Sequence, residues 1–382
     1  MARIVVLMFP EPGHLLPTVR LAARLLKDGH SVTYATLPCY RSALCDLGFD
    51  LRAAFEDPLE RTNRPVVSLP LWTSPAPGVD LWRSLGAAAG ISDAPVRTII
   101  RAVAATVIVP AVVDGEPDLL LCDAKIAAAC GDVLARSLPN CRLVAIRTEL
   151  PIGDPVAHLD LVLCPVQLEL PTLRSVTSGR HYCEASVFRR RLVADGSTGV
   201  ADVRGHERLI FCSLGTQAVA YEQATAVLSR VIGAFAGRDG YRLVVAAGAL
   251  ADRVDDASQA ANVEICRSVD QLRVLSRASL AVLHGGLGGV KEAVLAGVPM
   301  VVVPFVFDQR PNADRVVAHD LGAMVLPGDA TADLMRRTAD DVLSDARIAS
   351  GVARMQAIFR DAESRDIAFG HVTRVLEEVA TR

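Results

Sequence analysis

Two histidines in this chain each follow an apolar segment and have a side chain suited to chemistry. His14 follows the apolar segment 3–9, and His284 follows Leu280–Leu283 and precedes a turn with four glycines in five residues. An imidazole titrates near neutral pH and can take the proton of a hydroxyl group as that group attacks. A glycine turn that starts a helix directs unpaired N–H groups, and the positive end of the helix dipole, at an anion. The two histidines therefore predict proton removal at one position and anion binding at the other.

The glycine turn after His284 is the more informative of these two positions. It contains Gly286, Gly288 and Gly289, and the pattern predicts a helix that begins near Val290. Missing side chains let a ligand approach the backbone closely, and His284 can donate a further hydrogen bond. Most glycine-rich turns of α/β proteins bind no ligand, so this one needs support from its neighbours. With such support, the expected ligand is a pyrophosphate.

Three polar residues further along the chain supply that support. Glu292 lies one turn inside the predicted helix, where its carboxylate can accept hydrogen bonds from a ribose diol. Asp308 and Gln309 follow the next predicted strand, 300–303. Open α/β sheets bind their ligands at the carboxyl ends of the strands. We therefore expect these side chains and the glycine turn at one edge of one sheet.

Together these residues resemble the donor-binding signature of family 1 glycosyltransferases, the UDP-glycosyltransferase superfamily, especially its bacterial natural-product members. The matching segments are His284-Gly285-Gly286, Glu292, Gly297-Val298-Pro299-Met300 and Asp308-Gln309 with Asn312-Ala313. Further matches lie at 13–17, 21–25 and 29–33 near the amino terminus, and at Ser213-Leu214-Gly215-Thr216. The matches occur in the family's order over nearly the whole chain, so their combination is specific.

The resemblance implies the GT-B fold, in which two Rossmann-like, doubly wound parallel-sheet domains face each other across a cleft. It also implies direct displacement with inversion at the anomeric carbon and no metal ion, and no Asp-x-Asp pair stands at a predicted strand end. His14 would be the base, and Asp123 occupies the position of the family's aspartate partner. A carboxylate behind an imidazole fixes its tautomer and stabilises the imidazolium. Two plainer roles stay open, because His14 could cap a helix and Asp123 is a favoured N-cap residue.

The resemblance also assigns contacts with the nucleotide sugar. Asp308 and Gln309 would bind hydroxyls of the transferred sugar, and Thr216 would assist at the diphosphate. The nucleobase would lie against Val269 and Gln271.

The chain departs from the family pattern at three of its positions. Ser268 stands where an aromatic residue often stacks on the base, Asp270 replaces a proline, and Gly289 replaces the usual Thr or Ser that contacts phosphate.

The elements that position these residues follow from the hydrophobic pattern. Predicted strands lie near 3–9, 31–36, 119–122, 143–146 and 161–164, with helices near 13–27 and 124–136. A second series contains strands near 209–213 and 242–246 with a helix near 221–235. Such alternation is typical of doubly wound parallel sheets. We expect an acceptor domain over 1–190, a polar linker over 191–205, a donor domain over 206–365, and a helix within 366–382 that returns to the first domain.

The segment 61–90 interrupts the first series. It is rich in proline and contains Trp72 and Trp82. Loops inserted in a rigid scaffold often bind ligands, and by the family resemblance these tryptophans would line the acceptor pocket. They could equally well fasten a long loop to the domain.

The composition excludes several classes of protein. A net charge of −3 argues against binding to nucleic acid, because no basic excess exists to neutralise phosphates. The apolar stretch 102–113 is too short to cross a bilayer, and 3–9 is a strand rather than a signal peptide. Nine cysteines without C-x-x-C spacing indicate buried thiols rather than disulfides or a zinc site. We therefore expect a cytoplasmic protein, either a monomer or a homodimer.

The sequence predicts a glycosyltransferase that moves a sugar from a UDP- or TDP-sugar to a hydroxyl of a small hydrophobic natural product. The nucleotide sugar would be a co-substrate, and no cofactor or metal is expected. Two alternatives stay open: a non-catalytic binding protein of the same fold, and a nucleotide-sugar 2-epimerase, which does not normally carry this signature at 297–300 and 308–309. A NAD-dependent dehydrogenase is disfavoured, because no G-x-G-x-x-G follows the first strand.

Overall fold

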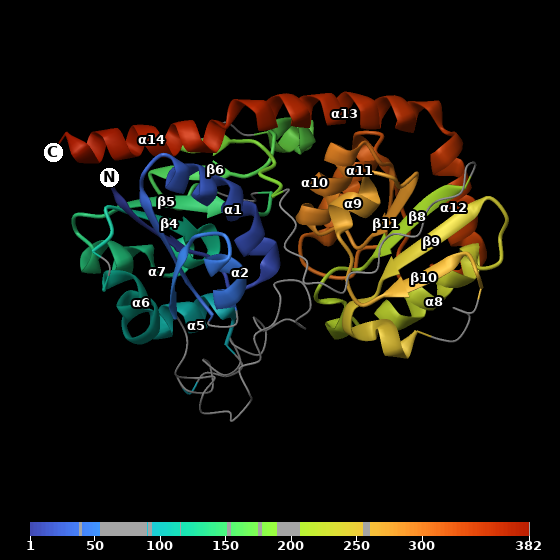
Figure 1. The fold of residues 1–382 in the computed structure, drawn as a ribbon, viewed down its shortest axis with the longest axis horizontal. Coiled ribbons are helices and arrows are strands. Elements are labelled where there is room, and N and C mark those ends of the chain that lie inside the picture. The colour runs from blue at the N-terminus through green and yellow to red at the C-terminus, as the bar shows by residue number, and fades with distance from the viewer. Residues whose placement is uncertain are drawn as a thin grey trace.

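The computed structural model describes residues 1–37, 40–53, 90, 94–114, 116–150, 154–174, 178–188, 207–254 and 260–381. They form two α/β domains, each built on its own parallel sheet (Figure 1). The prediction of two doubly wound parallel-sheet domains is therefore confirmed. Trp72, Trp82 and the predicted linker 191–205 lie outside the described residues.

The first sheet has seven parallel strands in the order β3-β2-β1-β4-β5-β6-β7. Their bounds are β1 Arg3–Leu7, β2 Ser31–Thr36, β3 Asp50–Ala53, β4 Leu119–Asp123, β5 Arg142–Arg147, β6 Leu159–Val162 and β7 Arg180–Tyr182. The helices are α1 Pro12–Lys27, α2 Arg41–Cys45, α5 Val96–Val103, α6 Val109–Val113 and α7 Ala124–Ser137. All five residues of β4 are buried, as expected for a central strand covered by helices on both faces.

The second sheet has six parallel strands in the order β10-β9-β8-β11-β12-β13. Their bounds are β8 Arg208–Ser213, β9 Tyr241–Ala246, β10 Val263–Cys266, β11 Leu280–Leu283, β12 Met300–Val302 and β13 Gly322–Met324. The helices are α8 Ala224–Phe235, α9 Gln271–Leu275, α10 Leu287–Ala296, α11 Gln309–Ala318, α12 Ala332–Ser344, α13 Ala346–Arg365 and α14 Ile367–Ala380. Helix α8 begins three residues after the predicted start at 221, because a short 3-10 turn, Ala218–Ala220, precedes it.

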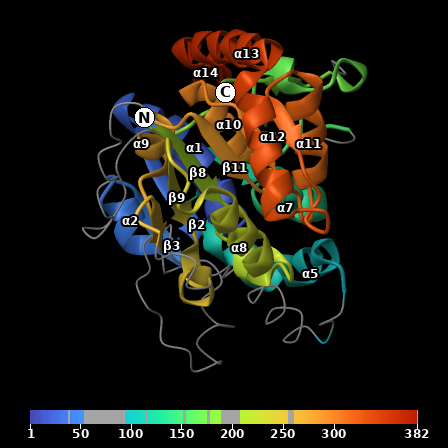
Figure 2. The ribbon, with the colours of Figure 1, turned by 90° about the vertical axis from the view of Figure 1, so that its right-hand side faces the viewer.

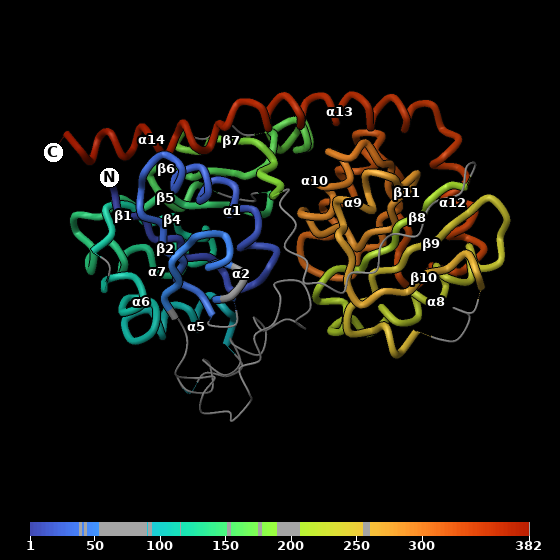
Figure 3. Tube along the Cα trace, viewed as in Figure 1, coloured from blue at the N-terminus to red at the C-terminus, as the bar shows by residue number. Residues whose placement is uncertain are grey.

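The last two helices cross from the second domain to the first (Figures 1 and 3). Helix α13 packs against α10, and α14 packs against α1 and β5. The chain turns between them at Asp366, which has a left-handed backbone with φ of 46°. The buried residues of α14, Ala368, Val372 and Leu376, belong to the core of the first domain.

A second junction lies between helices α10 and α11 and the segments that follow β6 and β7. Lys291 of α10 is fully buried, and its ammonium donates to the carbonyls of Leu163 at 2.9 Å and Ala185 at 2.7 Å. Arg315 of α11 forms a buried ion pair with Glu169 at 2.7 Å. Because a buried charge left unpaired is costly, these contacts hold the two domains together along this side. Figure 2 shows α10 and α11 from the side of the second domain.

One helical stretch, Val96–Val113, is long and apolar enough by length and composition to cross a membrane, among the residues that were searched. It is longer than the apolar stretch 102–113 of the sequence analysis because it also includes residues 96–101. The stretch comprises α5, a π-helical turn and α6, and it packs against α7. Its buried side chains, which include Ile99 and Ile108, lie in the core of the first domain, whereas Arg97 and Arg101 are exposed. This one-sided burial is that of an amphipathic core helix.

Candidate functional site

His14 lies in the first turn of α1, at the carboxyl edge of the first sheet. Helix α1 begins at Pro12, where a proline fits because the first N–H groups of a helix lack intrahelical partners. Strand β1 is flanked by β2 and β4. The adjacent strand β4 ends at Asp123, so the sheet brings the two side chains together although 109 residues separate them.

The imidazole of His14 is held from its Nδ1 side. Nδ1 lies 2.7 Å from Oδ2 of Asp123 and 3.0 Å from the hydroxyl oxygen of Thr148. The other oxygen of Asp123 accepts the backbone N–H of Lys125 at 2.8 Å, so this aspartate also caps α7. Asp123 thus contacts His14 with one oxygen and caps α7 with the other. With Nδ1 engaged, Nε2 is the ring nitrogen left for a ligand.

The surroundings of His14 favour its charged form. Burial alone would lower the pKa of the imidazole, but the carboxylates of Asp123 and Glu149 outweigh this effect and raise the pKa to about 9. His14 is only 7% exposed, so solvent screens these interactions little. These carboxylates therefore stabilise the imidazolium, the form that His14 takes when it accepts a proton.

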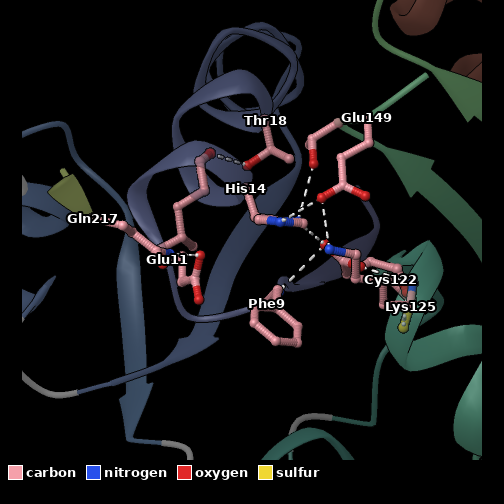
Figure 4. A network of polar contacts seen from close by, with 11 residues as sticks. Phe9, Glu11, His14, Thr18, Cys122, Lys125, Glu149 and Gln217 are labelled. Carbon is pink, nitrogen blue, oxygen red and sulfur yellow. Dashed lines mark hydrogen bonds and ion pairs between the residues drawn. The ribbon is translucent and has the colours of Figure 1, made fainter. Parts of the chain in front are cut away.

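Glu149 and Lys125 complete the polar network around His14 (Figure 4). Oε1 of Glu149 lies 3.6 Å from Nε2 of His14 and 2.6 Å from Nζ of Lys125. Nζ of Lys125 also lies 5.4 Å from the centre of the Phe9 ring. Sequence reasoning missed both residues. Glu149 comes two residues after β5, so the rule that ligands gather at strand ends could have identified it.

The glycine turn of the second domain follows β11 at the same edge of its sheet. Helix α10 begins at Leu287, three residues before the predicted start at Val290, with Gly286 as N-cap. Gly288 and Gly289 therefore belong to the first helical turn, despite the low helix propensity of glycine. The first-turn N–H groups of such a helix lack intrahelical partners and favour an anion.

His284 is packed tightly between two glycines. A Cβ atom at Gly215 would lie 2.5 Å from the His284 ring, and a Cβ atom at Gly286 would also lie 2.5 Å from it. Gly215 also has a φ of +82°, which side-chain-bearing residues rarely adopt. Burial lowers the pKa of His284 to about 4. His284 is therefore neutral at pH 7 and can donate a hydrogen bond without carrying charge.

Gly288 differs from these glycines because no nearby protein atom excludes a side chain at this position. A Cβ atom there would meet no atom within 4 Å, whereas at Gly289 the nearest atom, of Leu283, would lie 3.7 Å away. The backbone at the start of α10 therefore borders open space. This geometry is compatible with the close approach of a ligand to the N–H groups.

Asp308 and Gln309 come after β12, and Asn312 connects them to the glycine turn. The amide nitrogen of Asn312 donates to the carbonyl of Gly285 and to Oδ2 of Asp308, both at 2.9 Å. Burial raises the pKa of Asp308, and the Glu149 carboxylate raises it further. The charges of Asp308 and Glu149 therefore interact between the two domains.

Gln309 is almost fully buried, and its amide is used inside its own domain. Oε1 accepts the backbone N–H groups of Phe305 at 2.8 Å and Val306 at 3.1 Å, and Nε2 donates to the hydroxyl of Tyr221 at 2.9 Å. In this structure Gln309 therefore shapes the loop that presents Asp308. The adjacent Phe307 is 77% exposed and has a φ of 56°, a strained backbone that is often found at functional sites. The sequence analysis did not single out Phe307.

Glu292 and Gln271 lie side by side in the second domain. Nε2 of Gln271 donates to Oε2 of Glu292 at 2.5 Å, and burial raises the pKa of Glu292 to about 7. Val269 is half-buried and packs against the core of the second domain. Asp270 caps α9 by accepting the N–H of Arg273, which explains a carboxylate at this position.

Glu292 and Asp270 also line a pocket of about 1090 Å³ between the two domains. Its other walls come from α1, α9 and α13 and from Val187 and Phe188. Both domains therefore border the space next to the Gln271–Glu292 pair.

One hydrogen bond connects the two halves of the site directly. Nε2 of Gln217 in the second domain donates to Oε2 of Glu11, the N-cap residue of α1, at 2.5 Å (Figure 4). Gln217 lies two residues after Gly215, which contacts His284, and Glu11 lies three residues before His14. The segment after β8, which packs against His284, therefore contacts the start of the helix that carries His14. Thr216, between Gly215 and Gln217, is exposed.

The sequence of this chain resembles those of known glycosyltransferases. Residues 232–364 match the family described as Erythromycin biosynthesis protein CIII-like, C-terminal domain. The chain is 33% identical over 153 residues to the oleandomycin glycosyltransferase of Streptomyces antibioticus, which is 40% of this chain and 35% of that protein. The chain thus spans about a third of the length of this relative.

Solved structures resemble nearly the whole chain. The crystal structure of the glycotransferase of kitacinnamycin covers 98% of this chain and 99% of its own, with a TM-score of 0.74 and 22% identity. CalG4, the calicheamicin glycosyltransferase, gives a TM-score of 0.72 at 21% identity, over 100% of this chain and 99% of its own. This chain has the GT-B fold of natural-product glycosyltransferases. The resemblance that the sequence motifs indicated is therefore confirmed, and the His14 network and the glycine turn belong to different domains of a GT-B protein.

Proposed function

We propose that this GT-B protein is an inverting, metal-independent glycosyltransferase that moves a sugar from a UDP- or TDP-sugar to a hydroxyl of a small hydrophobic acceptor. The observation that carries the proposal is the pairing of His14 with Asp123 at 2.7 Å, with Nε2 directed away from that pair. An alcohol is a poor nucleophile until it loses its proton during attack. His14 is the base that would receive this proton, and Asp123 would stabilise the imidazolium.

The chemistry would proceed in one displacement. The acceptor oxygen attacks the anomeric carbon from the side opposite the diphosphate, and its proton passes to Nε2 of His14. The bond between the anomeric carbon and the diphosphate oxygen breaks, and the electron pair leaves with the diphosphate. The configuration at the anomeric carbon is inverted.

The second domain would stabilise the leaving diphosphate. The N–H groups at the start of α10 and the neutral imidazole of His284 are hydrogen-bond donors that require no metal ion. Thr216 is exposed beside them and could add a hydroxyl contact. Within the described residues, no three His, Cys, Asp or Glu side chains gather as a metal site.

The remaining donor contacts would come from the pair Gln271–Glu292 and from Asp308. Glu292 would accept hydrogen bonds from the ribose, with Val269 and Gln271 at the base. Asp308 would bind a hydroxyl of the sugar, while Gln309 would act indirectly, because its amide holds the loop.

A panel of nucleotides tests the proposal without knowledge of the acceptor. A ligand that binds only the folded protein raises the melting temperature. At a concentration of 100 times its Kd, it adds about 2.7 kcal/mol to the free energy of unfolding. We expect UDP, TDP or one of their sugars to raise it, and AMP and NAD to leave it unchanged. The nucleotide sugar selected in this way is then incubated with a library of hydrophobic alcohols and phenols, and the products are searched for the mass of one added sugar. Failure of every nucleotide to stabilise the protein would remove the donor site from the proposal.

A further inference from the structure

The Nε2 side of His14 is where an acceptor hydroxyl has to lie, because Nδ1 is engaged by Asp123 and Thr148. For proton transfer the hydroxyl oxygen must approach Nε2 to about 2.6–3.2 Å. That position is bordered by a side chain of the protein itself. Oε1 of Glu149 lies 3.6 Å from Nε2, too far for a good hydrogen bond but close enough for an ionic contact.

Glu149 has a second partner that holds it more closely. Its Oε1 lies 2.6 Å from Nζ of Lys125, which is the first basic residue of α7. The side chains of Glu149 and Lys125 are 34% and 47% exposed, so both have room to change rotamer. The backbone of Glu149, in contrast, is fixed close to the end of β5.

We propose that Glu149 is a positioning residue for His14, whose carboxylate holds the Nε2 side of the imidazole as long as no acceptor hydroxyl occupies it. This inference rests on the proposed role of His14 as the base. A hydroxyl that donates to Nε2 must displace Glu149 from the imidazole. The Glu149 carboxylate then keeps Lys125 as its ionic partner. As the acceptor enters, Nε2 gives up its proton to solvent, and the loss of this carboxylate neighbour favours the neutral imidazole, which can then accept the proton of the hydroxyl.

The charges around His14 support this assignment. The groups that face it are Glu11 at the N-cap of α1, Asp123 at the end of β4, Lys125 in α7, Glu149 after β5 and, beyond Glu149, Asp308 of the second domain. The buried thiol of Cys122 next to Asp123 stays neutral, because burial raises its pKa. Asp123 and Glu149 favour the protonated imidazole and Lys125 opposes it. Removal of Glu149 and removal of Lys125 should therefore move the titration of His14 in opposite directions.

The test is the titration of His14 by NMR, which requires neither substrate nor turnover. The chain has eight histidines, and the resonance of His14 is identified as the one missing from H14A. In Glu149→Gln the pKa of His14 should fall by about one unit, the usual effect of an opposite charge within a few ångströms. In Lys125→Met it should rise. Asp132→Asn, an exposed charge on the same helix α7 that pairs with Arg101, is the matched control and should change nothing.

An unchanged pKa in Glu149→Gln would overturn the inference, and Glu149 would then be only a surface partner of Lys125. Glu149→Asp should restore part of the shift, because the carboxylate returns on a shorter side chain. If Glu149→Gln does not fold, Glu149→Ala is titrated in its place: a fall in the pKa of His14 supports the inference and an unchanged value overturns it. These titrations stand whether or not the protein transfers sugar, so failure of this inference and failure of the proposed function are separate results.

Discussion

The two domains both build their halves of the site at the carboxyl ends of central strands and yet favour different charge states of their histidines. Both sheets have the same order of central strands, with β1 next to β4 in the first and β8 next to β11 in the second. His14 follows β1 beside the Asp123 carboxylate, and His284 follows β11 between two glycines. Carboxylates raise the pKa of the first above its usual range, to about 9, and burial lowers that of the second to about 4. The same residue type is thus stabilised in its charged form in one domain and in its neutral form in the other.

The largest effect is expected from the first histidine. His14→Ala should reduce turnover by about 10²–10⁴-fold, the usual contribution of a general base. The affinity for UDP or TDP should stay nearly the same, because His14 lies in the other domain. His158→Ala, an exposed histidine of the first domain, is the control. Equal activity of His14→Ala and the parent protein would remove His14 from the role of base.

The second histidine should affect binding rather than proton transfer. His284→Ala should weaken the binding of free UDP or TDP by about tenfold or more, the value of one hydrogen bond to a charged group. Isothermal calorimetry measures this directly, with His14→Ala as the matched variant that should bind normally. Unchanged affinity would contradict the assignment of His284 to the diphosphate.

Substitutions at two glycines near His284 should distinguish an effect on packing from an effect on ligand binding. Gly286→Ala should lower the melting temperature, because its Cβ atom would lie 2.5 Å from the His284 ring. Gly288→Ala meets no protein atom within 4 Å and should keep or raise the melting temperature, since alanine favours a helix by about 1 kcal/mol over glycine. Its affinity for UDP or TDP should nevertheless fall, because the added methyl group occupies the space beside the N–H groups. If Gly288→Ala binds nucleotide normally, the diphosphate does not contact this turn.

The smallest effect is expected from the removal of metal ions. Hydrogen-bond donors of α10 and His284 would stabilise the leaving diphosphate, so transfer should proceed at the same rate in excess EDTA. Rates measured with EDTA and with added Mg²⁺ give the comparison. Strict dependence on Mg²⁺ would show that the second domain does not act as proposed.

The sequence predicted the features that depend on local patterns and missed those that depend on tertiary contacts. The central strands and the glycine turn were predictable because apolar runs and glycines are visible in one segment. Strands β3, β7, β10 and β13 are short or partly exposed and lack such a run, so they were missed. The predicted start of α10 was three residues late, because glycine disfavours helices and the pattern could not show that tertiary packing prevails here.

The candidate site shows the same division. His14, Asp123 and His284 were identifiable because each stands at the end of an apolar segment. Glu149 was missed, because only its place after β5 marks it in the sequence and its distance to His14 is visible only in the fold. The internal use of Gln309 was likewise invisible, since its partner Tyr221 lies 88 residues away.

The path of the carboxyl-terminal helices has a practical consequence for recombination between related chains. Residues 346–365 pack on the second domain, but Ala368, Val372 and Leu376 fill the core of the first, and the N–H of Ala368 is bonded to Glu184 there. A chimera that exchanges the second domain at a single junction would bring a foreign α14 into the native first core. An exchange that ends at Asp366 instead would keep the tail with the half that it stabilises.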